Sequence, residues 1–200
     1  MSENTTLINL LVVVASVRTD RVGHLIGRWV GDRVRDSLGD SAVVRDVDLR
    51  EVALPADAEL VPGGGASTPV SERVAEADGF VIVTPEYNHA YPAALKRFID
   101  WHYAEWQFKA ATVVPYGVQG GLLAGEFLRP VLAELSVVTT RRMVGLRAPW
   151  ARIGTSDDGR ARFDADDGER RGVRDAVGEL AWWSETLRDA RTRRPFTPAG

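Results

Sequence analysis

The chain has 200 residues, of which 44% are hydrophobic, a formal net charge of −3 and no cysteine. This length favours a single domain over residues 1–200, and the charge gives no reason to expect nucleic acid or an anionic membrane as a partner. The lack of cysteine excludes disulfides, thiol nucleophiles and thiolate metal sites. No apolar run approaches membrane-spanning length and the apolar start lacks a basic segment before it, so a cytoplasmic protein is expected.

Strands and helices are predicted to alternate along the chain. Continuous apolar runs at 7–15, 80–83 and 110–116 predict strands buried on both faces, and a run interrupted by charges at 42–49 predicts a strand near a sheet edge. A short β-branched run at 137–140 is the candidate fifth strand. Apolar residues at helical spacing predict the helices, at 24–38, 67–77, from Pro92 onward, 122–135 and 169–190.

This alternation predicts an α/β fold built on a doubly wound parallel sheet. Right-handed crossovers leave few topologies, and we expect a three-layer, five-stranded sheet of the flavodoxin-like order 2-1-3-4-5. In that order the first, third and fourth strands end beside one crevice. The three most distinctive loops of the chain follow those strands.

Three segments are expected to lack regular structure. Prolines and the glycine triplet at 63–65 break the segment 51–66, and a flexible surface loop is favoured there over a phosphate site because no strand immediately precedes the triplet. Glycine and aspartate dominate 151–169, which we expect to be a solvated loop. The basic tail, 191–200, is expected to be frayed.

The first loop has the chemistry of an anion site. Ser16 and Thr19 carry hydroxyls, and Arg18 and Arg21 carry guanidinium groups, of which Arg18 can bind a phosphate through two parallel hydrogen bonds. Backbone N–H groups at the start of the next helix, near Gly23, would add a fixed positive field. The loop matches neither G-x-x-x-x-G-K-[ST] nor G-x-G-x-x-G, which argues against a Walker loop and weakens a dinucleotide-binding interpretation. An ordinary polar loop is the alternative.

The other two loops suit a flat ring system. The segment 85–91 combines rigid turns with two tyrosines, which can supply an aromatic wall and backbone donors and acceptors at its edges. The segment 116–121 has three glycines, which let the backbone approach a ligand closely. Turn formation alone would also explain either loop.

Three stretches of the sequence resemble the NADPH-dependent FMN reductase family of flavodoxin-like flavoproteins. They are ASVR at 15–18 with Arg21 and Gly23, TPEYN at 84–88 with YPAALK at 91–96 and DW at 100–101, and YG at 116–117 with GG at 120–121. The resemblance extends over residues 7–146. The chain departs from the family at Ala15, where many members have glycine, and at His24, where a small hydroxyl residue often supports the phosphate.

The resemblance implies three groups of FMN-binding residues. The phosphate would be held by Ser16, Arg18, Arg21, Gly23 and His24. The isoalloxazine would be lined by Pro85, Glu86, Tyr87 and Asn88. Its other edge would be approached by Tyr116, Gly117, Gly120 and Gly121.

The resemblance also implies an enzyme in which NADPH passes a hydride to FMN and FMN passes it to a small-molecule acceptor, such as a flavin, a quinone or an azo compound. The cofactor carries this chemistry, so no catalytic residue and no metal ligand is expected, and Glu86 is expected to orient the site rather than donate a proton. A non-enzymatic flavin-binding electron carrier or a redox-responsive interaction protein is the alternative. The mild net charge and the PEYN loop favour the reductase.

Further expectations concern the nicotinamide and the oligomer. Trp106 and Trp150 are candidates for bordering the nicotinamide pocket. Members of the family are usually oligomeric. The resemblance therefore implies a homodimer or homotetramer formed through the helix after Pro92, with Asp100 and Trp101 facing the partner.

Overall fold

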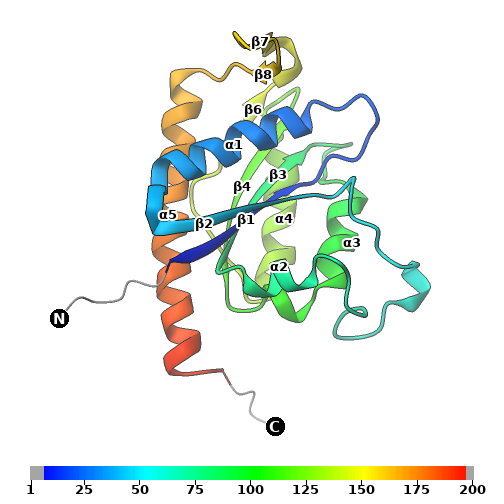
Figure 1. Cartoon of the computed structure of the whole chain (residues 1–200). Coiled ribbons are helices and arrows are strands. Elements are labelled where there is room, and N and C mark those ends of the chain that lie inside the picture. The colour runs from blue at the N-terminus through cyan, green and yellow to red at the C-terminus, as the bar shows by residue number, and fades with distance from the viewer. Residues whose placement is uncertain (1–6, 197–200) are drawn as a thin grey trace, which may run out of the picture.

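A parallel sheet forms the centre of the computed structural model, which describes residues 7–196 (Figure 1). Its strands are β1 (Ile8–Val14), β2 (Ala42–Asp48), β3 (Gly79–Pro85), β4 (Ala110–Gly117) and β5 (Val138–Thr139). They follow the order β2-β1-β3-β4-β5, so the predicted order is confirmed. β2 lies at an edge, in keeping with its interrupted apolar pattern.

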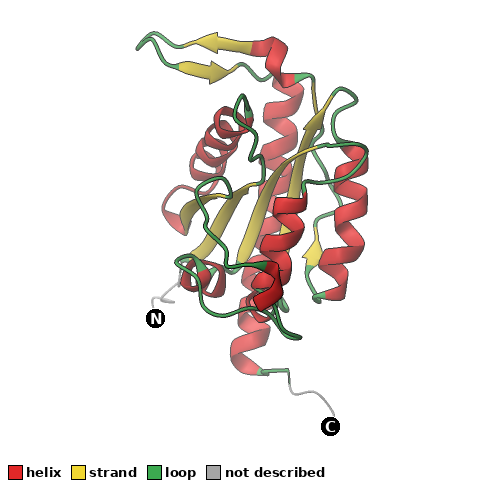
Figure 2. Ribbon diagram, turned by 90° about the vertical axis from the view of Figure 1, so that its right-hand side faces the viewer, coloured by secondary structure: helices red, strands yellow, loops and turns green. Residues whose placement is uncertain are grey.

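Helices cover both faces of the sheet, which gives the predicted three layers (Figure 2). α1 (Gly23–Leu38) and α5 (Asp167–Arg193) pack on one face; α2 (Ser71–Glu76), α3 (Ala93–Trp101) and α4 (Leu122–Glu134) pack on the other. Alternate residues of β1 belong to different cores: Leu10 and Val12 pack with α1 and α5, and Leu11 and Val13 pack with the other three helices. Burial on both faces explains why β1 is apolar along its length.

The fifth strand is interrupted. β5 pairs with the start of β4, β6 (Leu146–Arg147) pairs with its end, and the chain between them leaves the sheet. The Arg129 guanidinium, from α4, donates to the Thr139 hydroxyl and to the Thr140 carbonyl, both at 2.9 Å. A side chain thus satisfies the backbone at the point where the predicted strand ends early.

The segment 151–169 is not the solvated loop that its composition suggested. It forms an antiparallel hairpin of β7 (Ile153–Thr155) and β8 (Ala161–Phe163), and α5 begins at Asp167. Phe163 is 3% exposed and packs edge-on against Trp29 of α1, with ring centroids 5.2 Å apart. This apolar contact holds the base of the hairpin against α1, while the rest of the hairpin projects beyond the sheet (Figure 2).

The C-terminal helix extends further than predicted. α5 continues to Arg193, and Arg191 donates to the buried Asp78 carboxylate at 2.9 Å and to the Phe108 carbonyl at 2.6 Å. The prediction of a tail frayed from residue 191 is therefore wrong for 191–193, because these contacts hold the last turns of the helix. The end of that predicted tail, 197–200, lies outside the described residues.

The glycine triplet packs on Trp101. A Cβ on Gly65 would lie 2.1 Å from the Trp101 Cε2, and the indole N–H donates to the Ala66 carbonyl at 2.8 Å. Trp101 is 2% exposed, so the prediction that it faces a partner is wrong, because its own chain covers it. Asp100 pairs with Lys96 at 2.6 Å.

Lys109 is a buried ammonium immediately before β4. It is 6% exposed and donates to the Val74 and Ala75 carbonyls at the end of α2, at 2.9 and 2.7 Å. Burial lowers the pKa of Lys109 from 10.5 to about 8. Between these two pH values the unfolded chain binds the proton and the folded chain does not, so the free energy of unfolding rises with pH.

We predict that the wild type gains stability relative to Lys109→Met as the pH rises from about 8 to about 10, by at most about 3 kcal/mol. Denaturant unfolding of both proteins across this range measures the difference. Lys96→Met is the matched control, because Lys96 is the other lysine of the chain and is half-exposed. A stability difference that does not change with pH would contradict the lowered pKa.

Candidate functional site

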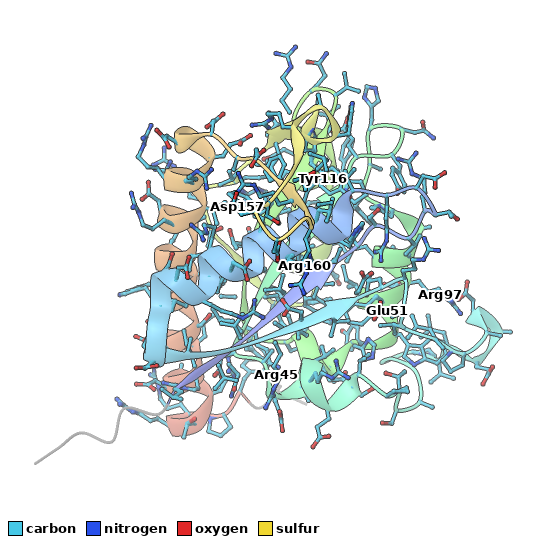
Figure 3. The ribbon with its side chains drawn as sticks, turned by 45° about the horizontal axis from the view of Figure 1, so that its top comes forward. Arg45, Glu51, Arg97, Tyr116, Asp157 and Arg160 are labelled. Atoms are coloured by element: carbon cyan, nitrogen blue, oxygen red, sulfur yellow. The ribbon has the colours of Figure 1, made fainter. Side chains whose placement is uncertain are left out.

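The ladder between β1 and β3 ends with a hydrogen bond from the Ala15 N–H to the Val83 carbonyl, at 2.9 Å. Beyond it the chain from β1 leads to α1 on one face, and the chain from β3 leads to α3 on the other. A cavity of about 360 Å³, here called the switch-point cavity, lies between the two loops. Figure 3 labels Tyr116, part of its wall, near the start of α1. The cavity is lined by Ser16, Arg18, Asp20, Arg21, Val22, Pro85, Glu86, Tyr87, Tyr116, Gly117, Val118 and Trp150.

Ser16 and Arg18 form a polar end of this cavity. Ser16 is buried, and it follows β1 after one intervening residue. α1 begins at Gly23 without a side-chain cap, so the N–H groups of its first turn have no side-chain acceptor. The Leu25 N–H donates to the Val22 carbonyl at 3.0 Å, which leaves the earlier N–H groups of the turn for a ligand. Such N–H groups beside a guanidinium create the positive field that binds phosphate at many helix starts.

Arg21 lines the same cavity, but Asp48 at the end of β2 holds its guanidinium. The two terminal nitrogens of Arg21 lie 2.5 and 2.6 Å from the two carboxylate oxygens, and one also donates to the Ser16 carbonyl at 2.6 Å. Hydrogen bonding to Asp48 raises the pKa of Arg21. Arg50 supports the same loop by donating to the Arg18 and Thr19 carbonyls, at 2.7 and 3.2 Å. These contacts fix the shape of the segment 16–22 and tie it to β2.

Close packing at the start of α1 requires Gly23. A Cβ there would lie 2.5 Å from the Tyr116 hydroxyl and 2.6 Å from the Ser16 Cβ. The Tyr116 hydroxyl is hydrogen-bonded to Ser16, and burial raises the pKa of Tyr116 to about 12, so this hydroxyl is neutral near pH 7. His24, by contrast, is exposed and lines a different cavity, between α1 and the end of β2.

Tyr87 is positioned by a tight turn. The Tyr87 N–H donates to the Ala90 carbonyl at 2.8 Å and the reverse bond measures 3.0 Å, while Asn88 and His89 have φ of 50° and 68°. Two left-handed central residues define the type I′ turn, and asparagine adopts this conformation readily. The turn directs the Tyr87 ring under Arg18, whose guanidinium carbon lies 4.8 Å from the ring centroid. The buried Tyr87 hydroxyl has no hydrogen-bond partner among the described residues.

Glu86 connects the second loop to the third. Its carboxylate accepts hydrogen bonds from the Leu123 and Ala124 N–H groups, at 3.2 and 3.4 Å, and so caps the start of α4. Gly121 has φ of 72°, and a Cβ on it would lie 2.5 Å from the Tyr116 nitrogen. Gly117 lines the cavity, whereas Gly120 and Gly121 form the turn behind it and Asn88 lies in the neighbouring turn.

The family model for NADPH-dependent FMN reductase matches residues 8–150. The chain belongs to this family. An NAD(P)H-dependent FMN reductase of Saccharomyces cerevisiae is 36% identical over 141 residues, which are 63% of this chain and 74% of the relative. Another, of Schizosaccharomyces pombe, is 34% identical over 152 residues, which are 72% of this chain and 75% of the relative.

Solved structures share the fold of this reductase. The flavoenzyme FerB, an NAD(P)H:acceptor oxidoreductase from Paracoccus denitrificans, matches with a TM-score of 0.66 at 20% identity, over 90% of this chain and 99% of that one. A flavodoxin from the domain Archaea matches with a TM-score of 0.59 at 11% identity, over 90% of this chain and 99% of that one. The flavodoxin-like fold is confirmed, as is the prediction of an oxidoreductase that uses FMN and NAD(P)H.

The two tryptophans proposed to border the nicotinamide differ in position. Trp150 lines the switch-point cavity and is 48% exposed. Trp106 is fully buried in the core against Phe80, with ring centroids 4.0 Å apart, so the prediction for Trp106 is wrong. In the sequence, Trp106 lies close to a predicted strand, and this position alone does not reveal that its side chain packs against a face of the sheet.

Sequence reasoning missed Asp48, the residue on which the shape of the first loop depends. A carboxylate at the end of the strand beside β1 was the available signal, but nothing in the sequence pairs it with an arginine 27 positions away. Among residues 7–196 of the reductase, no three histidine or acidic side chains gather in an arrangement that could hold a metal ion.

We predict that Asp48→Asn weakens FMN binding about tenfold, because the loop 16–22 loses its charge-assisted anchor. Fluorescence titration of FMN into the apoprotein measures the dissociation constant. Asp46→Asn is the matched control: Asp46 lies on the same strand and pairs with Arg35, away from the loop. Equal FMN affinity for Asp48→Asn and the wild type would show that the Arg21–Asp48 pair does not support the site.

Proposed function

We propose that FMN binds in the switch-point cavity, with its phosphate at Ser16, Arg18 and the first turn of α1 and its ring system against Tyr87. One observation supports this placement above the others. A guanidinium and an uncapped helix start lie at one end of a cavity that also contains an unpartnered, buried tyrosine hydroxyl. The guanidinium and the helix start suit a phosphate. The tyrosine ring with its free hydroxyl suits a flat ring system with polar edges.

When bound, FMN would supply the redox chemistry, by accepting a hydride from NAD(P)H and passing it to an acceptor. The residues of the chain bind the cofactor and orient it. Arg21 and Asp48 hold the phosphate loop in shape, and the neutral Tyr116 hydroxyl keeps Ser16 in place. Arg18 lies over the Tyr87 ring, so ring packing there requires Arg18 to turn toward the phosphate.

We propose a quinone or a second flavin as the acceptor. The 2-hydroxy-1,4-benzoquinone reductase of a Burkholderia species is 36% identical over 74 residues, and a quinone reductase of Escherichia coli is 33% identical over 104 residues. The half-exposed Trp150 would give a flat acceptor an aromatic surface at the cavity. The family match argues against the electron-carrier alternative.

The test is an anaerobic visible spectrum of the FMN-loaded protein before and after NADPH, followed by a benzoquinone. We expect NADPH to bleach the flavin band and the quinone to restore it. Bound flavin that NADPH leaves oxidised would contradict the reductase function. Steady-state NADPH oxidation with a quinone, a flavin and an azo dye then ranks the acceptors.

In the fluorescence titration of FMN into the apoprotein, we expect Tyr87→Ala to weaken FMN binding about tenfold, the equivalent of about 1.5 kcal/mol for a lost aromatic contact. Tyr103→Ala, at a tyrosine that is 38% exposed and outside the cavity, is the control. An FMN affinity that Tyr87→Ala leaves unchanged would exclude Tyr87 as a wall of the ring site.

We also propose a homodimer or homotetramer that uses the α3 and α4 side of the molecule. An apolar surface formed by Val118, Leu122, Leu123 and Phe127 supports it, since each of these residues is at least 41% exposed. It adjoins Glu86 and therefore the switch-point cavity.

We expect Phe127→Glu to shift the protein to monomer in sedimentation equilibrium, because a charge would enter an apolar contact. Trp182→Glu, on the exposed side of α5, is the control. An oligomer that survives Phe127→Glu and dissociates with Trp182→Glu would place the interface on α5 instead.

A cytoplasmic location is part of the proposal, because the reaction draws on NAD(P)H and FMN. No described helix is long and apolar enough to cross a membrane. Recovery of the protein in a secreted or membrane fraction of its native cells would contradict this location.

A further inference from the structure

A second cavity lies between α1 and the β7–β8 hairpin. It encloses about 390 Å³, and we call it the hairpin groove. One wall is a face of α1 that includes Leu25, Arg28 and Trp29, and the opposite wall is the hairpin. In Figure 3 the labelled Arg160 lies against the ribbon of α1, with Asp157 nearby on the turn.

The hairpin groove and the switch-point cavity both reach the first turn of α1. Val22 lines the cavity, and Leu25, one turn further along the chain, lines the groove. Trp150 also lines the cavity, and from it the chain continues into the hairpin, whose groove-lining residues begin at Ser156. A ligand that is bound over the flavin could therefore extend into the groove along α1.

Positive charge exceeds negative charge in the groove. Three aspartates line it, at 32, 158 and 164, against five arginines, at 28, 33, 160, 162 and 170. Arg162 pairs with Asp164 at 2.9 Å and Arg160 with Asp158 at 3.5 Å. Arg28 is exposed and interacts electrostatically with Asp158 across the groove, without being held in a close ion pair among the described residues. A guanidinium of this kind is suited to bind a phosphate through two hydrogen bonds.

Two N–H donors of the lining residues have no acceptor. They are the Trp29 indole N–H and the Arg33 Nε–H, both of which are buried without a partner among the described residues. Trp29 is only 8% exposed. Buried donors without acceptors are unfavourable, and an acceptor-rich ligand that reached them would stabilise both.

The spacing of the arginines along α1 suits an extended dinucleotide. With a rise of 1.5 Å per residue, Arg28 lies about 9 Å and Arg33 about 16 Å along the helix axis from Val22. A nicotinamide over the flavin and an adenosine in the groove would be joined by the pyrophosphate across this distance. The groove would then hold the half of the coenzyme that distinguishes NADPH from NADH.

We propose that the hairpin groove binds the 2′-phosphorylated adenosine half of NADPH, with Arg28 as a principal phosphate-binding residue, and so sets the preference for NADPH over NADH. This assignment depends on the proposed function for the complete coenzyme. The binding of the isolated adenosine half does not depend on it.

Calorimetric titration with 2′,5′-ADP and, separately, with 5′-AMP tests the proposal on the FMN-loaded protein. We expect 2′,5′-ADP to bind the wild type at least about tenfold more tightly than 5′-AMP, and Arg28→Ala to remove most of this difference. Arg160→Ala should also weaken the binding of 2′,5′-ADP. Arg141→Ala, at an exposed arginine after β5, is the matched control and should bind like the wild type.

Steady-state kinetics give a second readout. Arg28→Ala should raise the KM for NADPH more than the KM for NADH. No binding of 2′,5′-ADP, equal binding of 5′-AMP, or identical affinities in Arg28→Ala and the wild type would each overturn the proposal. If one of these results were found and NADPH still bleached the flavin, the groove proposal would fail and the proposed function would stand. If 2′,5′-ADP bound as expected but NADPH did not reduce the flavin, the groove proposal would stand and the proposed function would fail.

Discussion

The parallel ladder between β1 and β3 is the constraint on which the site depends. It ends at the bond from Ala15 to Val83, and from that point the two chains must leave for opposite faces of the sheet, because α1 covers one and α3 the other. Because the two chains diverge, a cavity remains between them at the carboxyl ends of the strands. Its walls are then the start of a helix on one side and the Tyr87 turn on the other, which differ in chemistry as the two ends of a flavin nucleotide do.

Much of this arrangement could be predicted because its signals are local. A strand buried on both faces must be apolar at every position, so β1, β3 and β4 are visible as continuous runs. Alternation with helices then restricts the sheet to few orders. The PEYN turn is local too, since Asn88 adopts the left-handed conformation that the turn needs. The predicted strand order is therefore enough to place Ser16, Arg18 and Tyr87 close together, because their loops follow neighbouring strands.

The parts that could not be predicted depend on contacts between distant segments. Asp48 holds Arg21 from the end of another strand, and Asp78 holds Arg191 across 113 positions. Composition made 151–169 look solvated because its turn is polar, yet Phe163 anchors the hairpin to Trp29. A single buried aromatic in a polar segment outweighs its neighbours, since its burial contributes roughly 2 kcal/mol.

The two arginines of the first loop have different physical situations, and this difference bears on which of them can respond to a ligand. Arg21 is bound through both terminal nitrogens, and its side chain is 9% exposed. Moving it would leave the Asp48 carboxylate without its partner in a largely buried place, which is costly. Arg18 rests on an aromatic ring, a contact of about 1 kcal/mol that a phosphate can easily exceed. Arg21 is thus suited to keep the loop in shape, and Arg18 is the residue suited to turn toward an anion.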